Sequence, residues 1–140
     1  MTTVVGATAV VDPTGARVVE VVDAGPLTTV QDLPGRLGHW DVGVPPSGPM
    51  DALSHRLVNR IVGNAPDAAA LECTGIGPRL RAHAPLVVCV GGAAMRATVD
   101  GRPVPLWQPV TVDAGSELAL GPIDGPGQRT YVAFRGGIDV

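Results

Sequence analysis

The chain has 140 residues, a formal net charge of −3 and ten basic residues, all of which are arginines. A chain of this length fits one domain that buries roughly two-thirds of the surface exposed by its unfolded form. The absence of lysine excludes Schiff-base lysine chemistry, a Walker-type phosphate lysine and biotin attached to this chain, and the slight negative charge argues against a nucleic-acid-binding protein.

The composition also predicts the fold class. Hydrophobic residues make up 45% of the chain but aromatic residues only 3%, and there are 19 glycines and 14 prolines. Such a composition implies an aliphatic core, frequent turns and few helices. We therefore expect a mostly β protein, built as a sandwich or a barrel.

The first 17 residues are expected to form an N-terminal extension, with at most an early strand at 9–12. No charged region precedes the first apolar stretch, as it would in a signal peptide, and no apolar run approaches the ~18 residues of a membrane span. We therefore expect a cytoplasmic protein without a membrane segment. The domain proper should occupy residues 18–140.

Two extended segments are predicted at the start of this domain. The segment "RVVEVVDAG", residues 17–25, is rich in β-branched residues and stops at a Gly-Pro pair. The segment "LTTVQD", residues 27–32, is a second run of strand-forming residues. Both patterns are typical of short strands bounded by turns.

One amphipathic helix is predicted at about residues 50–62. Its apolar stripe, expected to face the core, consists of Met50, Leu53, Leu57 and Ile61. Its other face carries His55, Arg56, Asn59 and Arg60. Ser47 or Asp51 is expected to cap the N-terminus, and Pro49 suits the first turn. Gly63 and Asn64 should end the helix.

The remainder of the chain predicts strands and turns, after a single short helical turn within residues 65–72. The expected strands cover residues 86–90, 95–99, 109–112, 117–120 and 129–134. Asp100-Gly101 is a two-residue hairpin signal between two of them, and residues 113–115 indicate another turn.

The stretch of residues 27–51 combines conformational specialists with reactive groups. Its four glycines and four prolines predict a stiff loop whose amides a ligand can approach, as in an anion cradle. Polar or flat surfaces are supplied by Gln31, Asp32, Arg36, Trp40 and Asp41. An arginine suits a carboxylate, a tryptophan a planar ring and an aspartate an N–H group. The alternative, in which Asp32 pairs with Arg36 and Trp40 fills the core, remains open.

Other notable residues have simpler structural explanations. Glu72 lies in an apolar stretch, so it is an exposed edge residue, half of a buried pair or a functional acid, and the structural explanations are favoured. Gly91 and Gly92 either turn near a ligand or form a bulge. Trp107 is expected to be a packed surface anchor.

No metal site is expected. His39, His55 and His83 are too far apart to share a helix face, and no Cys/His cluster exists. Cys73 and Cys89 lie in apolar segments without a C-x-x-C spacing, so we expect reduced core residues.

Several separated motifs resemble the biotin-dependent carboxyltransferase domain family. They are "GPLTTVQDLPGRLGHWDVGVPPSGPMD", "RIVGN", "DGRPVPLW" and "GGIDV". That family includes the carboxyltransferase region of urea carboxylase (urea amidolyase), allophanate hydrolase subunit 2, the C subunit of 5-oxoprolinase and a Kip-type antagonist of a sporulation-kinase inhibitor. The resemblance covers about residues 18–140. It implies a cyclophilin-like β-barrel module that forms the first half of the domain.

The loop is most similar to the urea carboxylase branch, which implies transfer of a carboxyl group from carboxybiotin, borne by a partner domain, to urea or a related small amide. In that chemistry Asp41 or Asp32 would orient or deprotonate the acceptor amide, and Arg36 would bind the carboxylate. The remaining candidates for substrate or biotin binding are Gln31, Trp40, Gly43, Ser47, Gly48, Met50 and Asp51.

The resemblance also implies partners. These are a biotin carboxylase with its biotin carrier, and a second half of the domain that contains a "GSRST"-like motif. One alternative is a subunit of an ATP-dependent amide hydrolase, with ATP bound in the assembled complex and a partner that is KipI-like or of the 5-oxoprolinase B type. Another is a non-catalytic Kip-type regulatory module.

Overall fold

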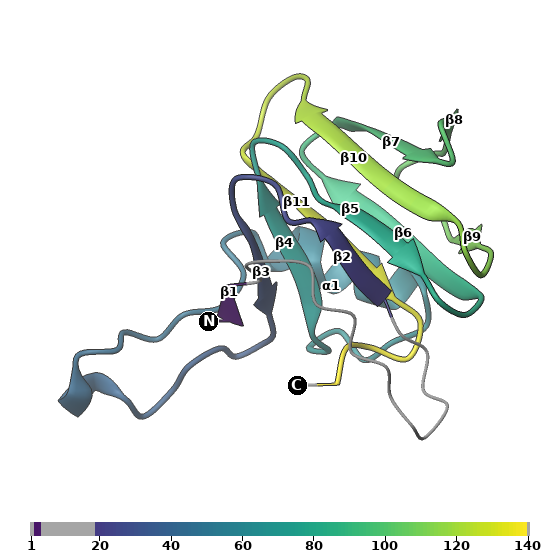
Figure 1. The fold of residues 1–140 in the computed structure, drawn as a ribbon. Helices are drawn as coiled ribbons and strands as arrows, with labels where there is room; N and C mark the ends of the chain where they lie inside the picture. The colour runs from purple at the N-terminus through teal and green to yellow at the C-terminus, as the bar shows by residue number, and fades with distance from the viewer. Residues whose placement is uncertain (1, 4–18, 140) are drawn as a thin grey trace.

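The structure, a computed structural model, describes residues 2–3 and 19–139, which form two antiparallel sheets and one α-helix (Figure 1). The first sheet has the order β1 (Thr2–Thr3), β3 (Thr28–Gln31), β4 (Ala70–Thr74), β11 (Arg129–Phe134), β6 (Leu86–Gly92), β9 (Val110–Val112). The second has the order β2 (Val19–Asp23), β5 (Arg79–Ala82), β10 (Glu117–Ile123), β7 (Met95–Val99), β8 (Arg102–Pro103). The helix is α1 (Ala52–Ile61), and a short 3₁₀ helix, η1 (Trp40–Val42), precedes it. The predicted mostly β module with one main helix is confirmed. Among the described residues, the two sheets do not join into one closed barrel, and below we use the word barrel for the two packed sheets.

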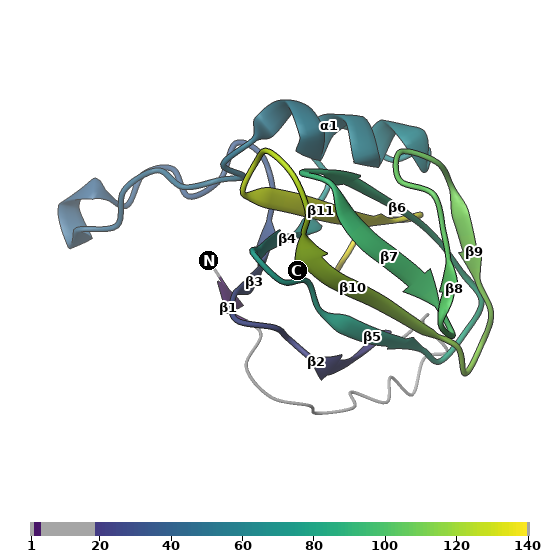
Figure 2. The same ribbon diagram turned by 90° about the horizontal axis from the view of Figure 1, so that it is seen from above.

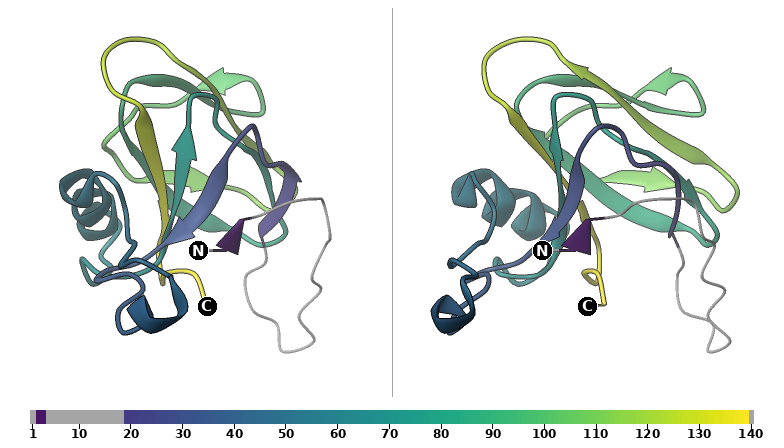
Figure 3. Two further views of the ribbon diagram at one scale, coloured as in Figure 1. Left: turned by 90° about the vertical axis from the view of Figure 1, so that its left-hand side faces the viewer. Right: turned by 60° about the vertical axis from the view of Figure 1, so that its left-hand side comes forward.

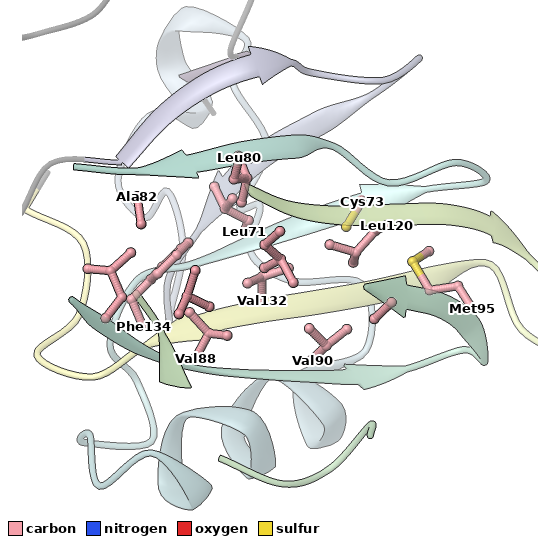
Figure 4. Close-up of a cluster of buried hydrophobic side chains, with 14 residues drawn as sticks. Leu71, Cys73, Leu80, Ala82, Val88, Val90, Met95, Leu120, Val132 and Phe134 are labelled. Atoms are coloured by element: carbon pink, nitrogen blue, oxygen red, sulfur yellow. The ribbon is translucent and has the colours of Figure 1, made fainter. Parts of the chain in front are cut away.

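The main core lies between the two sheets (Figure 4). Successive side chains of a strand point to opposite faces, so alternate residues face the core. Strands β6 and β11 of the first sheet contribute Val88, Val90, Val132 and Phe134. Strands β5 and β10 of the second sheet contribute Leu80, Leu118 and Leu120. The core is therefore mainly aliphatic, as the composition predicts, with Phe134 as its one aromatic residue and Cys73 and Met95 as its sulfur-containing ones.

Helix α1 covers the outer face of the first sheet, where it contacts β6 and β11 (Figure 2). A second buried cluster fills this layer, and it consists of Val58, Val62, Ala70, Cys89, Tyr131 and Ala133. Strands β6 and β11 are thus covered on both faces. This double burial explains why their sequences, "LVVCVGG" and "RTYVAF", are almost continuously apolar.

The face by which α1 packs is not the predicted apolar stripe. Met50 and Leu53 are each 68% exposed and Leu57 is 40% exposed, whereas His55 and Asn59 are fully buried. The prediction was wrong because it assigned the polar side chains of the helix to the solvent face. Polar side chains can be buried when they are hydrogen-bonded. Asn59 Nδ2 donates to the Ala68 carbonyl at 2.8 Å, for example, so its amide has the partner that burial requires.

The ends of α1 follow local signals. Asp51 is the N-cap, as predicted, and its Oδ1 accepts from the Ser54 amide at 3.0 Å. Pro49 lies two residues before that cap, so its predicted place in the first turn was wrong. Gly63, with φ of 86°, donates its amide to the Arg60 carbonyl and ends the helix as predicted.

Most predicted strands and turns are confirmed. Strands β7 and β11 have the predicted bounds, and Asp100-Gly101 joins β7 to β8 with positive φ at both residues. The predicted short helical turn in residues 65–72 is present only as a single turn, in which the Ala68 amide donates to the Ala65 carbonyl at 3.1 Å. It does not extend further, because β4 begins at Ala70 and pairs with two neighbouring strands. Strand β5 was not predicted, and the expected early strand at 9–12 lies outside the described residues.

Candidate functional site

Residues 32–50, which we call the arm, leave the end of β3, turn at η1 and return to the start of α1. Figures 1 and 2 show the arm extending away from both sheets, and Figure 3 turns its tip toward the viewer. Its two limbs are paired by backbone hydrogen bonds. The Arg36 amide donates to the Ser47 carbonyl at 2.7 Å, and the Val44 amide donates to the His39 carbonyl at 3.0 Å. The motif-rich stretch is therefore a projecting element.

The limbs cross closely at Gly35. A Cβ built on Gly35 would lie 1.3 Å from the Ser47 carbonyl oxygen, and the φ of this glycine is +87°. No residue with a side chain fits there unless the limbs separate, because contacts shorter than about 3 Å are repulsive. Gly48 is also close to the outgoing limb, since its Cβ would lie 3.3 Å from the Asp32 carbonyl oxygen. Both glycines permit the limbs to pair.

The tip of the arm presents an aromatic ring and a carboxylate to the surroundings. Trp40 is 68% exposed, and Asp41 and Val42 beside it are exposed as well. Gly43 ends η1 in the left-handed conformation, where its amide donates to the Trp40 carbonyl at 3.0 Å. Within the described part of the chain, no hydrogen bond or ion pair engages the Asp41 carboxylate. The tip can therefore contact another molecule or another part of a larger protein.

The return limb is attached to the barrel by two buried side chains of the first sheet. Glu72 Oε2, from β4, accepts from the Met50 amide at 2.8 Å and from the Tyr131 hydroxyl at 2.7 Å. The Tyr131 oxygen, from β11, in turn accepts from the Asp51 amide at 2.8 Å. Burial raises the pKa of Tyr131, and the bond to Glu72 adds to this effect, so the hydroxyl keeps its proton.

Glu72 is also half of a buried ion pair, as the favoured sequence interpretation implied. Its Oε1 lies 3.4 Å from Arg129 Nε, and both side chains are largely buried. That nitrogen makes no well-aligned hydrogen bond. The arginine therefore contributes charge compensation, and the hydrogen bonds to Glu72 come from Tyr131 and Met50.

The outgoing limb is attached through His55 of α1. His55 Nε2 lies 3.0 Å from the Gln31 carbonyl oxygen, which can only accept, so Nε2 carries the proton. Burial lowers the pKa of His55, while the bond to Gln31 and the charge of Glu72 oppose this effect in part. The imidazole is therefore neutral. Its ring meets the Tyr131 ring edge-on, with the centroids 5.9 Å apart.

The structure separates the predicted site residues into groups. Trp40, Asp41 and Gly43 lie at the tip, and Asp32, Arg36, Ser47 and Gly48 lie along the limbs. Met50 and Asp51 lie at the base, where Met50 is exposed and Asp51 caps the helix. Gln31 is buried in β3, and its amide donates to Thr29 Oγ1 at 2.9 Å. No ion pair joins Asp32 to Arg36 in the described residues.

Sequence reasoning missed two residues of the base. The helical pattern assigns His55 to the solvent face of the helix, and nothing local signals its partner, Gln31. Tyr131 stands out in the sequence only as one of four aromatic residues. Each contacts a segment distant in the sequence, such as Asp51, which lies 80 residues from Tyr131. Rarity of aromatic residues was the single available signal.

Three other features of the described residues bear on function, namely the reactivity of their cysteines, the grouping of potential metal ligands and the length of the helix. Burial raises the pKa of the Cys73 thiol to about 12 and that of Cys89 to about 11, so both remain protonated core residues. Within residues 2–3 and 19–139, no three His, Cys, Asp or Glu side chains gather closely enough to hold a metal ion. Helix α1 has ten residues, and the described residues contain no helix of the length and apolarity that a membrane span needs.

The chain is similar to several known proteins. It is 47% identical over 121 residues to the urea amidolyase of Lachancea kluyveri. The aligned segment covers 86% of this chain and 7% of that protein. It is 34% identical over 121 residues to the C subunit of 5-oxoprolinase from Escherichia coli, with 86% of this chain and 38% of that protein covered. The crystal structure of Kluyveromyces lactis urea carboxylase superposes with a TM-score of 0.82 at 45% identity, over 87% of this chain and 11% of that chain.

The family model described as "Carboxyltransferase domain, subdomain A and B" matches residues 42–140. The matched range begins inside η1 and includes the return limb of the arm, α1 and β4 to β11. This chain spans 7% of the length of the urea amidolyase that it resembles. The chain belongs to the carboxyltransferase domain family and is related to urea carboxylase and to the C subunit of 5-oxoprolinase.

Proposed function

We propose that this chain is one portion of a biotin-dependent carboxyltransferase domain that transfers a carboxyl group to urea or to a related small amide. The observation that carries the proposal is the arm, which stands clear of the sheets with Trp40 and Asp41 exposed at its tip. The identity of 47% to a urea amidolyase supports urea as the acceptor.

The arm offers groups that suit such a reaction. A carboxylate at Asp41 can accept a hydrogen bond from the acceptor N–H and take its proton, and Arg36 can bind a carboxylate. The ring of Trp40 can stack on a planar ligand. Asp32, at the base of the outgoing limb, is the second candidate for the basic group. The amides of Val42, Gly43 and Val44 donate to carbonyls within the tip, so they are not available to a developing negative charge.

Carboxybiotin on a partner domain would supply the activated carboxyl group. The described residues do not enclose a biotin ring by themselves, because Trp40, the flat surface nearest the candidate residues, is 68% exposed. We propose instead that the arm forms one wall of a site completed by the other half of the domain.

This proposal assigns residues 18–140 to the first half of a carboxyltransferase domain and residues 1–17 to an extension before it. The partners would be a biotin carboxylase, a biotin carrier and the second half of the domain. A second candidate function is a subunit of an ATP-dependent amide hydrolase, supported by the 34% identity to the 5-oxoprolinase protein. In that case ATP would bind in the assembled complex.

A segment exchange tests the two candidates. The matching 121-residue segment of the Lachancea kluyveri urea amidolyase is replaced by this chain, and the matching segment of the Escherichia coli 5-oxoprolinase protein is replaced in parallel. We expect the first chimera to transfer a radiolabelled carboxyl group to urea. Asp41→Ala in that chimera should lower the transfer rate by about a hundredfold or more. The exposed Asp113 in the turn before β10 provides the control, Asp113→Ala, which should transfer at the parent rate.

A folded first chimera without urea-dependent transfer would contradict the proposal. Activity of the second chimera alone, measured as 5-oxoproline-dependent ATP hydrolysis, would favour the hydrolase.

A further inference from the structure

Three buried polar side chains bind the backbone at the two ends of the arm. His55 binds the Gln31 carbonyl, immediately before the outgoing limb. Glu72 and Tyr131 bind the amides of Met50 and Asp51, where the return limb ends. His55 and Tyr131 are fully buried and Glu72 is 8% exposed. The three side chains come from α1, β4 and β11, so the arm is joined to the helix and to the centre of the first sheet.

We propose that His55, Glu72 and Tyr131 are positioning residues that hold the arm in one orientation on the barrel and thereby set where Trp40 and Asp41 stand. The orientation is a property of this chain. Only its use in carboxyl transfer rests on the proposed function.

The hydrogen bonds to Glu72 and Tyr131 serve the arm and are not needed to cap the helix. Asp51 already caps α1, since its carboxylate accepts from the Ser54 amide and the Ser54 hydroxyl. Burying a carboxyl group such as that of Glu72 costs free energy unless the group is paired and hydrogen-bonded. An apolar pair would fill the same space between α1 and the sheet at a lower desolvation cost. The polar pair fixes instead the direction in which the chain enters the helix.

An orientation set at the base is transmitted to the tip because the limbs are paired. The Arg36 amide and the Ser47 carbonyl join the limbs at 2.7 Å, next to the close crossing at Gly35. The outgoing limb has one further backbone bond to the barrel side, from the Leu33 amide to the Asp67 carbonyl at 3.3 Å. Among the described contacts, three buried side-chain bonds therefore hold Gln31, Met50 and Asp51 at the two ends of the arm, beside this one backbone bond.

The Tyr131 hydroxyl is the centre of this arrangement because it is both donor and acceptor. It donates to Glu72 at 2.7 Å and accepts from the Asp51 amide at 2.8 Å. Tyr131→Phe removes both bonds, and it leaves the Asp51 amide without its partner while Glu72 still accepts from Met50. Glu72→Gln is the milder change, because an amide oxygen at that position can still accept from Met50.

The orientation is measured in the full chain with two spin labels. They are attached through Val42→Cys at the exposed tip and Arg102→Cys on the exposed β8. The native cysteines stay unlabelled, because both are buried and protonated. Pulsed electron paramagnetic resonance then gives the distribution of distances between tip and barrel. Amide hydrogen exchange at Asp51 is followed in the same samples.

The matched control is Thr130→Val. Thr130 is fully buried in β11, next to Tyr131, and its hydroxyl donates to the Ala93 carbonyl at 2.7 Å. This variant also loses one buried hydrogen bond, but it does not touch the arm. We expect a narrow distance distribution in the parent and in Thr130→Val, a broadened or shifted one in Tyr131→Phe, and a smaller change of the same kind in Glu72→Gln. Exchange of the Asp51 amide should rise about fivefold in Tyr131→Phe.

Two outcomes would overturn the inference. One is an unchanged distribution in both arm variants, and the other is an equal broadening in the control. The role in transfer is tested separately in the urea amidolyase chimera, where Tyr131→Phe should lower kcat with little change in KM for urea. Adding Tyr131→Phe to Asp41→Ala should cause a smaller loss than Tyr131→Phe causes in the parent chimera, since part of its effect acts through Asp41. A parent chimera without transfer would refute the proposed function and leave the positioning result intact.

Discussion

Gly35→Ala gives a direct test of the paired limbs. The new Cβ would lie 1.3 Å from the Ser47 carbonyl oxygen, so the limbs must move apart and the bond from the Arg36 amide to Ser47 must break. An alanine at a φ of +87° also adds backbone strain of about 1–2 kcal/mol. The lost hydrogen bond adds about 1 kcal/mol. The total cost to the ordered arm is about 2–3 kcal/mol.

Gly38 offers a matched control. Its φ is +81°, but a Cβ there would have nothing within 4 Å. Gly38→Ala therefore carries the backbone strain without the clash. The Arg36 amide should exchange at least about fivefold faster in Gly35→Ala than in Gly38→Ala, because only the first variant loses the bond to Ser47.

The assay is amide hydrogen exchange with site resolution, accompanied by urea unfolding of the barrel. The core between the sheets contains no arm residue, so the urea midpoint should be the same in both variants. Equal exchange of the Arg36 amide in the two variants would refute the reasoning, since it would mean that the crossing at Gly35 does not hold the limbs together.

Three further predictions concern the barrel. Burial lowers the pKa of His55 in the folded chain. Below about pH 6.5 the unfolded chain therefore binds more protons than the folded chain does. The free energy of unfolding should consequently fall as the pH drops below that value. Gly91→Ala would bring a Cβ to 2.6 Å from the Trp107 ring, so urea unfolding should show a loss of about 1–3 kcal/mol. Val58→Ala should cost about 1–3 kcal/mol in the same assay, against less than about 0.5 kcal/mol for the exposed Leu53→Ala.

Each of these three predictions has a matched control variant or a result that would contradict it. His55→Gln should weaken the pH dependence of the free energy of unfolding, and an unchanged pH dependence in this variant would contradict its assignment to His55. Gly121→Ala, where the nearest atom to a Cβ is 3.5 Å away, should cost much less than Gly91→Ala. A larger loss in Leu53→Ala than in Val58→Ala would support the helix face that the sequence pattern predicts and contradict the structure.

Local signals predicted the elements whose structure depends on neighbouring residues. The run "RTYVAF" reads as a strand because β-branched and aromatic residues fit a pleated sheet, and β11 has the predicted bounds. Asp100-Gly101 indicates a hairpin because these residues tolerate positive φ, and both have it. The cap at Asp51 follows from hydrogen bonds with Ser54, three residues along the chain. These features need no knowledge of the rest of the fold.

Features decided by contacts between distant segments could not be read in this way. Strand β5 was missed because its charged residues gain partners only from β10 and β2, as in the ion pairs of Arg79 and Arg81 with Glu117. The buried face of α1 was misassigned because the partner of His55 lies 24 residues away.

By itself the sequence determined a mostly β module, its main helix with its caps, and a conformationally restricted stretch rich in candidate site residues. The tertiary structure decided that this stretch is a projecting arm with Trp40 and Asp41 at its tip. It also decided that His55, Glu72 and Tyr131 meet at its base. The physical reason is that a turn or a cap depends on interactions within a few residues. The cost of burying a polar group, in contrast, depends on partners that only the folded chain brings together.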